Sequence, residues 1–331
     1  MYPIHRILVA IKDPQAKSLP AVAKAAQLAH AFDAELQLFH AIAEPLFVDT
    51  LGREAADIAE VEGQRRDAYR ERLEAIAKPL RRRGLAVATA VEWDFPIHEA
   101  VIRGAAQFEA DLIIAECHPT RHRVPWLLRF TDWELLRCSP LPVLLIKSKA
   151  AYRRPKILAA VDPGHTFAKP TNLDGEILRY ASTMAGALRG GLSAVHAYDL
   201  AASAVGLTAQ EFAVPAVQKR LRKAALERGR KLLDATLSKA RLPHARHYLV
   251  GRHPIDAILE VAERSGCGIV VMGAVSRSGL QRMFIGNTAE KLLDRLGCDV
   301  LIVKPRLFKN RIARARRGAQ LVAMAWDPAA V

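Results

Sequence analysis

Residues 131–147 read TDWELLRCSPLPVLLIK, and residues 288–304 read TAEKLLDRLGCDVLIVK. The two stretches align without a gap at one constant offset. Each begins with a pattern typical of an amphipathic helix and ends in a short, continuous apolar run before a lysine. A match of this length at a single offset indicates that the chain holds two copies of one unit.

The repeat also extends toward the start of each half. Ile7–Ile11 corresponds to Ile157–Val161, and each is an apolar run typical of a strand that is covered on both faces. Expected helices follow at Leu19–Phe32 and Leu173–Leu188, expected strands at Leu36–Ala41 and Leu192–Ala197, and long basic helices at Gln64–Arg83 and Lys219–Ala240. This alternation predicts two tandem α/β domains, each a doubly wound, open parallel sheet of the Rossmann-like kind.

The polar stretch Lys147–Pro155 ends in a proline and is typical of a linker. We therefore expect a first domain at 1–148 and a second at 149–306. A basic tail at 307–331 remains outside both.

The composition is that of a globular protein, with 51% hydrophobic and 25% charged residues. Apolar runs such as Leu141–Ile146 are strand-sized, so no transmembrane helix is expected. The start of the chain lacks the apolar core of a signal peptide. The four cysteines form no CxxC pair, which suits reduced thiols. These features predict a cytoplasmic protein.

A formal net charge of +15 raises the question of polyanionic partners. Nucleic acid, anionic lipid and nucleotides are the classes that such a charge attracts, although a solvated basic surface explains it as well. The tail carries seven cations between Lys304 and Arg317. It could form a basic amphipathic helix or be disordered, as chain termini often are.

The helix start GNTAE at 286–290, the segment TDWELLR at 131–137 and the two-domain layout resemble the universal stress protein family, and more narrowly its tandem, E-type members. The resemblance covers the chain up to about Pro305. It implies an open five-stranded parallel sheet in each domain. It also implies pairing of the last strands, which makes either a pseudo-dimer of the two domains or a homodimer.

In one subgroup the resemblance further implies ATP binding through a Gly–x2–Gly–x9–Gly–(Ser/Thr) motif, with an aspartate after the first strand. The residues that match these positions in the second half are Asp162, Gly273, Ser276, Gly286, Asn287 and Thr288, with Arg277 as an added cation in the loop. Ser276 replaces a glycine and Asn287 replaces a hydroxyl residue. Backbone N–H groups at a helix start favour an anion, but Asn287 and Thr288 are also ordinary helix caps.

The first half departs from this pattern. Lys12, followed by Asp13, stands where Asp162 does, and Glu116 stands where Gly273 does. Pro119 replaces the second glycine, and Arg129-Phe130 replaces Gly286-Asn287. A carboxylate repels phosphate, so we expect a plugged pocket or an apolar ligand site, with packing against the other domain as the alternative.

Sequence motifs for catalysis are absent: there is no P-loop, no GxGxxG fingerprint and no GxSxG elbow. Two histidine groupings, Cys117-His118 with His122 and His244 with His247 and His253, do not have zinc-site spacing, so neither a catalytic nor a metal site is predicted. The resulting expectation is a non-enzymatic stress-response regulatory protein. It would carry a degenerate site for ATP or another adenine nucleotide in its second domain. The alternatives are a weak ATP hydrolase and a module that binds polyanions or lipids.

Overall fold

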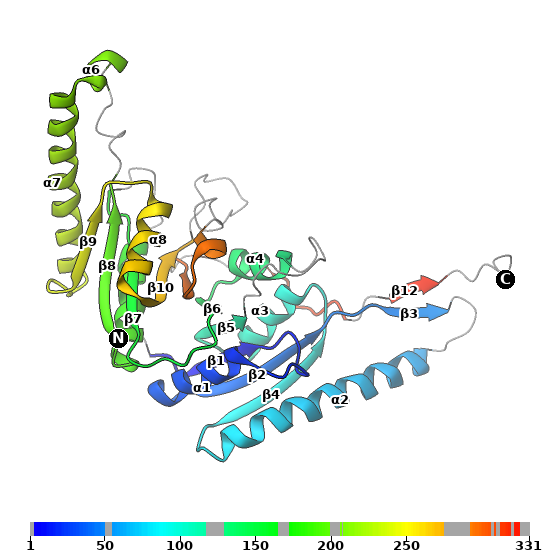
Figure 1. Cartoon of the computed structure of the whole chain (residues 1–331). Coiled ribbons are helices and arrows are strands. Elements are labelled where there is room, and N and C mark those ends of the chain that lie inside the picture. Colours follow the sequence, from blue (N-terminus) through cyan, green and yellow to red (C-terminus); the bar gives the residue numbers. More distant parts are fainter. Residues whose placement is uncertain are drawn as a thin grey trace. The chain divides into compact units, whose positions relative to one another are not determined.

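The computed structural model describes residues 3–49, 55–116, 129–164, 172–198, 206, 208–274, 292–305, 308, 312–318 and 321–324 (Figure 1). The chain divides into two compact units. We call Ile4–Leu141 together with Lys309–Val331 the N-terminal unit. Met1–Pro3 together with Pro142–Phe308 form the C-terminal unit.

The N-terminal unit is built on a parallel sheet. Its strands run in the order β4 (Val87–Trp93), β2 (Glu35–Ile42), β1 (Arg6–Ala10) and β5 (Leu112–Glu116). Helices α1 (Pro20–Phe32) and α2 (Ala55–Arg81) lie on one face, and α3 (Ile97–Gln107) and α4 (Arg129–Cys138) on the other (Figure 1). Ile7, Leu8 and Val9 of the central strand are completely buried. Cover on both faces explains why this strand is apolar throughout instead of alternating.

Helix α1 shows how the sequence sets a covering element. Pro20 occupies the first turn, where its missing N–H costs nothing. Val22, Ala25 and Leu28 recur at helical spacing and are buried. The helix therefore packs its apolar stripe on the sheet, in contact with β1, β2 and β5.

The C-terminal unit repeats this architecture. Its strands run in the order β6 (Val143–Ile146), β11 (Asp299–Val303), β10 (Cys267–Gly273), β7 (Lys156–Ala160), β8 (Gly191–Ala197) and β9 (Arg246–Val250). Its described residues include the helices α5 (Leu173–Ala187), α6 (Ala209–Ala213), α7 (Pro215–Lys239) and α8 (Pro254–Ser265), and residues 292–295 are helical as well. The pairs from β11 through β9 are parallel.

Equivalent strands have the same neighbours in the two units. The series β4-β2-β1-β5 corresponds to β9-β8-β7-β10, so the predicted tandem of doubly wound α/β sheets is confirmed. In both series the chain moves outward in one direction from the first strand and then crosses back to its other side. This reversal creates a switch point between β1 and β5 and another between β7 and β10.

The last strands of the two repeats pair with each other. Strand β6 runs antiparallel to β11, with Leu144 opposite Leu301 and Leu145 opposite Val300. By packing, β6 belongs to the C-terminal unit and the chain divides at residues 141 and 142. The boundary that we expect after residue 148 is based on the sequence repeats, and it differs from the boundary between the two packed units.

A buried aspartate fixes the chain just after β6. Asp299 is completely buried, and its Oδ1 accepts hydrogen bonds from the backbone N–H groups of Lys147 (2.9 Å) and Ser148 (3.0 Å). Its Oδ2 accepts one from the Tyr152 hydroxyl at 2.6 Å. Burial and the nearby carboxylate raise the pKa of Tyr152 well above its usual value. The polar stretch between the repeats is thus tied to β11.

A second, smaller sheet joins distant parts of the N-terminal unit. Strands β3 (Leu46–Asp49) and β12 (Leu321–Met324) pair in parallel, with Leu46 opposite Leu321. The expectation that the tail is disordered or forms a basic amphipathic helix is therefore wrong for residues 312–318 and 321–324, which contain no helix. None of the helices in the described part of the chain is both long and apolar enough to cross a membrane.

Candidate functional site

The switch point of the C-terminal unit lies between the carboxyl ends of β7 and β10. Ala160 of β7 is opposite Met272 of β10. Asp162 and Gly273 follow these two residues and therefore lie at the same end of adjacent strands. Doubly wound folds bind ligands in the crevice at such a point. The structure thus brings together two of the residues that the sequence assigns to a nucleotide site.

Asp162 presents a half-exposed carboxylate at this end. Its side chain is 50% exposed, and its Oδ1 lies 3.9 Å from Nδ1 of the buried His196 on β8. Its backbone N–H donates to Oδ1 of Asp174, in the first turn of α5, at 3.1 Å. Asp162 is therefore held through its backbone while its carboxylate faces solvent.

Gly273 has a packing role that the sequence does not reveal. A Cβ atom at this position would lie 2.5 Å from Cδ2 of Leu173 and 3.2 Å from Cδ1 of Ile177, both on α5. Its φ is not in the left-handed region, so the glycine supplies close approach and not an unusual backbone angle. Helix α5 uses the space that a side chain would fill. The remaining predicted site residues (Ser276, Arg277, Gly286, Asn287 and Thr288) lie outside the described residues.

The equivalent end of the N-terminal unit is occupied by its own carboxylate. Oε1 of Glu116, at the end of β5, accepts a hydrogen bond from the backbone N–H of Ala21 at 3.0 Å. Ala21 lies in the first turn of α1, whose N-terminal N–H groups attract an anion. A small cavity of about 70 Å³ remains there, lined by residues that include Lys12, Asp13 and Glu116. Glu116 thus takes a place where an anionic ligand would otherwise bind.

A larger cavity of the N-terminal unit is mostly apolar. It measures about 130 Å³, and its lining consists of Ala10, Ile11, Lys12, Phe39, Ala41, Ile97, His98, Val101, Ala115 and Leu135. These residues come from the carboxyl ends of β1, β2 and β5 and from α3 and α4. Apolar lining with one or two polar groups is typical of a small-molecule pocket. An apolar ligand site in the first half stays a prediction.

Three further histidines, one on a strand and two at helix starts, have structural surroundings. Nδ1 of the buried His40 lies 2.8 Å from the carbonyl oxygen of Ile11, and burial lowers the His40 pKa. His98 is half-buried, and desolvation likewise lowers its pKa below the usual 6.5. His253 begins α8, where its Nδ1 accepts from the backbone N–H of Ile255 at 3.4 Å.

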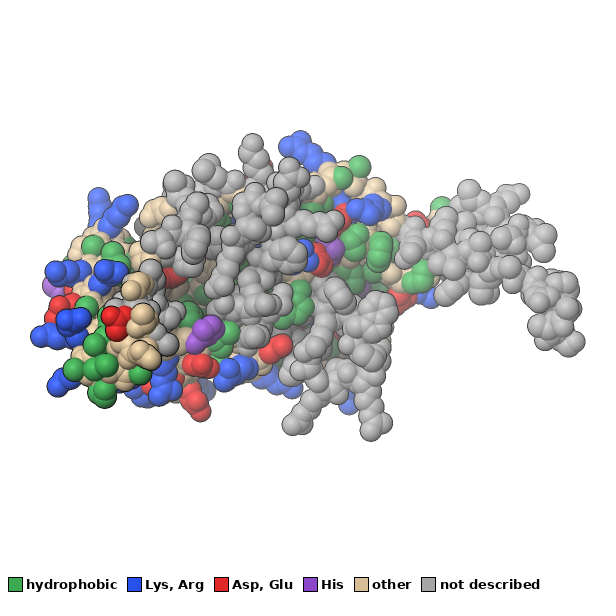
Figure 2. All heavy atoms as spheres, turned by 90° about the horizontal axis from the view of Figure 1, so that it is seen from above, with side chains coloured by type: hydrophobic (Ala, Val, Ile, Leu, Met, Phe, Trp, Pro, Cys, Tyr) green, Lys and Arg blue, Asp and Glu red, His purple; other side chains and the backbone are tan. Residues whose placement is uncertain are grey.

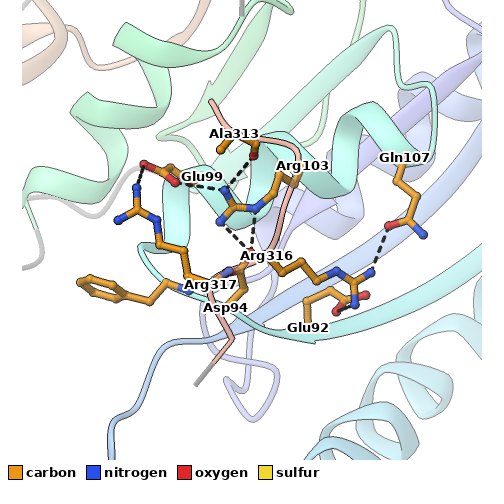
Figure 3. Close-up of polar contacts among 9 residues, drawn as sticks. Glu92, Asp94, Glu99, Arg103, Gln107, Ala313, Arg316 and Arg317 are labelled. Atoms are coloured by element: carbon orange, nitrogen blue, oxygen red, sulfur yellow. Dashed lines mark hydrogen bonds and ion pairs between the residues drawn. The ribbon is translucent and has the colours of Figure 1, made fainter. Parts of the chain in front are cut away.

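The tail adds a polar network beside the apolar cavity that the sequence gives no reason to expect (Figure 3). The carboxylates of Glu92, Asp94 and Glu99, at the end of β4 and the start of α3, face arginines of the tail. Arg316 pairs with Glu92 at 2.6 Å, and Arg317 pairs with Glu99 at 3.0 Å. Arg103 of α3 also contacts the tail, since its Nη1 donates a hydrogen bond to the carbonyl oxygen of Ala313 at 3.3 Å. The sequence holds both the arginines of the tail and the acids at 92–99, but nothing in it pairs the two groups.

Comparison with known proteins gives the same architecture. The model of the universal stress protein family matches residues 3–147 and 154–304. Universal stress protein E of Photorhabdus laumondii is 26% identical over 237 residues, which cover 70% of this chain and 74% of that protein. Universal stress protein E of Escherichia coli K12 is 26% identical over 230 residues, which cover 69% and 72%.

Solved structures agree with these relatives. A functionally unknown protein from Pseudomonas aeruginosa PAO1 is 25% identical, covers 92% of this chain and 93% of its own, and superposes with a TM-score of 0.68. A universal stress protein from Archaeoglobus fulgidus, 14% identical with a TM-score of 0.56, covers 92% of this chain and 100% of its own and shows the same fold. With both repeats matched along nearly their whole length, the chain belongs to the universal stress protein family and carries two of its domains in tandem.

Proposed function

We propose that this chain is a non-enzymatic stress-response regulatory protein that binds ATP or another adenine nucleotide in its C-terminal unit. The site would consist of Asp162 and Gly273 together with Ser276, Arg277, Gly286, Asn287 and Thr288. One observation carries the proposal: Asp162 and Gly273 lie at the carboxyl ends of adjacent strands on either side of the switch point.

The difference between the two halves supports this placement. In the N-terminal unit, Glu116 binds the backbone of α1 and occupies the anion position. In the C-terminal unit, the equivalent residue is Gly273, which carries no carboxylate and packs against α5, and the Asp162 carboxylate is half-exposed. An exposed carboxylate can accept hydrogen bonds from an amino group or a ribose hydroxyl of a nucleotide. The two halves would therefore differ in what they bind.

We infer a regulatory role, as opposed to turnover, from the surroundings of Asp162. His196, whose Nδ1 lies 3.9 Å from Oδ1 of Asp162, is buried with 4% of its surface exposed, which limits its contact with a substrate that enters from solvent. Phosphoryl transfer needs a base or water-positioning group in reach of the nucleophile. The protein would bind the nucleotide and leave it intact.

Equilibrium dialysis of labelled ATP against the full chain tests the proposal. We expect Asp162→Ala to weaken binding by about tenfold or more, because a hydrogen bond to a charged group contributes about 1.5–3 kcal/mol. Asp13→Ala, which removes the nearest carboxylate at the equivalent strand end of the other unit, is the matched control and should bind as the wild type does. Undiminished binding by Asp162→Ala would refute the placement. Turnover of ATP by the wild type would favour the weak hydrolase instead.

A basic helix favours polyanion binding as a second candidate function. Lys and Arg side chains gather at the left of Figure 2, the side on which Figure 1 shows α7. The exposed cations of α7 are Lys219, Arg220, Arg222, Lys223, Arg228, Arg230, Lys231 and Lys239. Binding of duplex DNA that weakens steeply with salt, and is lost when Arg222 and Lys223 are both changed to Glu, would support this function. The same pair of changes at Arg82 and Arg83 is the control.

A further inference from the structure

Three metal-ligating side chains of different kinds converge in the N-terminal unit. They are His98 of α3 and Glu134 and Cys138 of α4, and one ligand atom from each lies within 4.8 Å of the others. All three residues are half-buried. The sequence analysis does not single them out, because His98 is 36 positions or more from its two partners and the three fit no spacing motif.

The local structure explains why these groups meet. Glu134 and Cys138 are four residues apart on α4, so their side chains lie on one face of that helix. His98 is the second residue of α3, which packs against α4. Two rigid helices thus hold the three ligand atoms, which is the support that a metal site requires.

The arrangement of Glu134 leaves one oxygen for a cation. Its Oε1 accepts a hydrogen bond from Nη1 of Arg137 at 2.6 Å. Its Oε2 lies 3.8 Å from Sγ of Cys138, the thiol donor. A metal ion between Sγ and Oε2 would replace the weak thiol contact and leave the arginine contact intact.

The chemistry of these donors selects the ion. We propose that His98, Glu134 and Cys138 bind one zinc-class divalent cation through nitrogen, oxygen and sulfur. Three protein ligands of mixed type suit tetrahedral Zn²⁺ and leave its fourth position open, whereas Ca²⁺ and Mg²⁺ prefer oxygen ligands alone. A thiolate and a carboxylate balance the two charges of the ion. The guanidinium of Arg137, which stays paired with Glu134, adds one positive charge beside the site.

Binding involves one bond exchange. The S–H bond of Cys138 breaks, its proton passes to solvent, and the sulfur keeps the electron pair that forms the bond to the metal. No electron is transferred, so no oxidant or reductant is needed. Metal binding should therefore release about one proton for each ion.

The position of His98 gives the site a second property. His98 and Leu135 both line the apolar cavity of about 130 Å³ described above. The ion would thus lie beside that cavity, and a small molecule with an apolar body and one donor atom could fill both. In this way the N-terminal unit would bind a class of ligand different from the nucleotide proposed for the C-terminal unit.

Absorption spectroscopy with Co²⁺ tests the site in the full chain. Co²⁺ bound by a thiolate gives a charge-transfer band in the near ultraviolet, and displacement by Zn²⁺ measures the zinc affinity. We expect the wild type to show the band and Cys138→Ser to lose it, with a zinc affinity at least about 100-fold lower. His98→Gln and Glu134→Gln should weaken zinc binding by at least about tenfold.

Two controls test the thiols of Cys298 and Cys117. Cys298→Ser alters a cysteine of the other unit and should leave the band unchanged, as should Cys117→Ser, which lies outside the described residues. A band that persists in Cys138→Ser, or that disappears in Cys117→Ser, would overturn the proposal. So would a wild type without a band.

Alkylation gives a readout that needs no variant. In the wild type, Zn²⁺ should slow the reaction of Cys138 with iodoacetamide by at least about tenfold, because a metal-bound thiolate is protected. Cys298 serves as the internal control in the same digest and should react at an unchanged rate. Equal rates at Cys138 with and without Zn²⁺ would contradict the site even if every variant failed to fold.

Discussion

The backbone N–H of Arg317 donates a hydrogen bond to Oδ1 of Asp94 at 2.9 Å, although 223 residues separate the two in the chain. Oδ2 of Asp94 accepts from Nε of Arg103 at 2.8 Å, and Asp94 is 1% exposed. A buried carboxylate thus holds both α3 and the tail at the end of β4. Because the tail partner is a backbone group, the contact depends on the path of the chain and not on the identity of residue 317.

Removal of Asp94 should destabilise the protein strongly. Asp94→Ala removes the buried partner of the Arg103 guanidinium, whose side chain is 9% exposed, and leaves it paired with Glu99 alone. Complete loss of a buried partner costs about 3–5 kcal/mol in the free energy of unfolding, so we expect a loss of about 2–3 kcal/mol here, which urea titration measures. Asp67→Ala breaks the exposed pair with Arg70 and should cost less than about 1 kcal/mol. Equal losses in the two variants would contradict the role of Asp94.

Reversal of one tail charge should loosen the tail. Arg317→Glu places a carboxylate beside Glu99, with which Arg317 now pairs at 3.0 Å. Hydrogen exchange of residues 321–324, which pair with β3, should become about 5- to 30-fold faster, since attraction is replaced by repulsion worth about 1–2 kcal/mol. Arg314→Glu, at an exposed position of the same segment, is the control and should exchange as the wild type does.

A side chain at Gly273 should disturb packing before it affects any ligand. In Gly273→Ala the new Cβ would meet Leu173 of α5 at 2.5 Å. Overpacking of this kind costs about 1–3 kcal/mol in the free energy of unfolding. The loss should shrink when Leu173→Ala is added, which a double-mutant cycle would measure. Gly297→Ala meets no atom within 4 Å and should have little effect. A nucleotide assay on a Gly273 variant alone would therefore be ambiguous.

The Glu74 carboxylate should make stability fall in acid. Hydrogen bonds from Arg81 and Thr89 lower the pKa of Glu74 from 4.5 to about 2. Since the folded pKa is below the unfolded one, the stabilisation is complete above about pH 4.5 and is lost as the pH falls toward 2. Glu74 is 43% exposed, so the pair contributes at most about 1 kcal/mol.

The check is urea unfolding of the wild type and Glu74→Gln at pH 7 and at pH 2. We expect the difference between the two proteins to be present at pH 7 and to disappear in acid. Glu71→Gln changes an exposed glutamate of the same helix and should show no such dependence on pH. A difference that grows in acid would mean that the sign is wrong.

The sequence by itself determined the fold. Continuous apolar runs such as Ile157–Val161 are typical of strands that are covered on both faces, and their alternation with helical patterns leaves few topologies. Because TDWELLRCSPLPVLLIK recurs as TAEKLLDRLGCDVLIVK, the sequence predicts two copies of this fold. These signals are local, since each depends on the spacing of residues within one element. The resemblance to the universal stress proteins assigned Asp162 and Gly273 to one site, and the structure places both at the carboxyl ends of neighbouring parallel strands.

The tertiary structure alone decided which distant groups touch. The pairing of β12 with β3, the contact of Arg317 with Asp94 and the meeting of His98 with Cys138 each join segments with no shared pattern. Gly273 is a further case. The motif gives it a role in binding phosphate, whereas the structure shows that Leu173 of α5 packs closely against it. Hydrophobic periodicity reports which face of an element is buried, but it carries no information about the element that covers it. Those contacts are set by how whole helices and strands pack, which is a property of the complete chain.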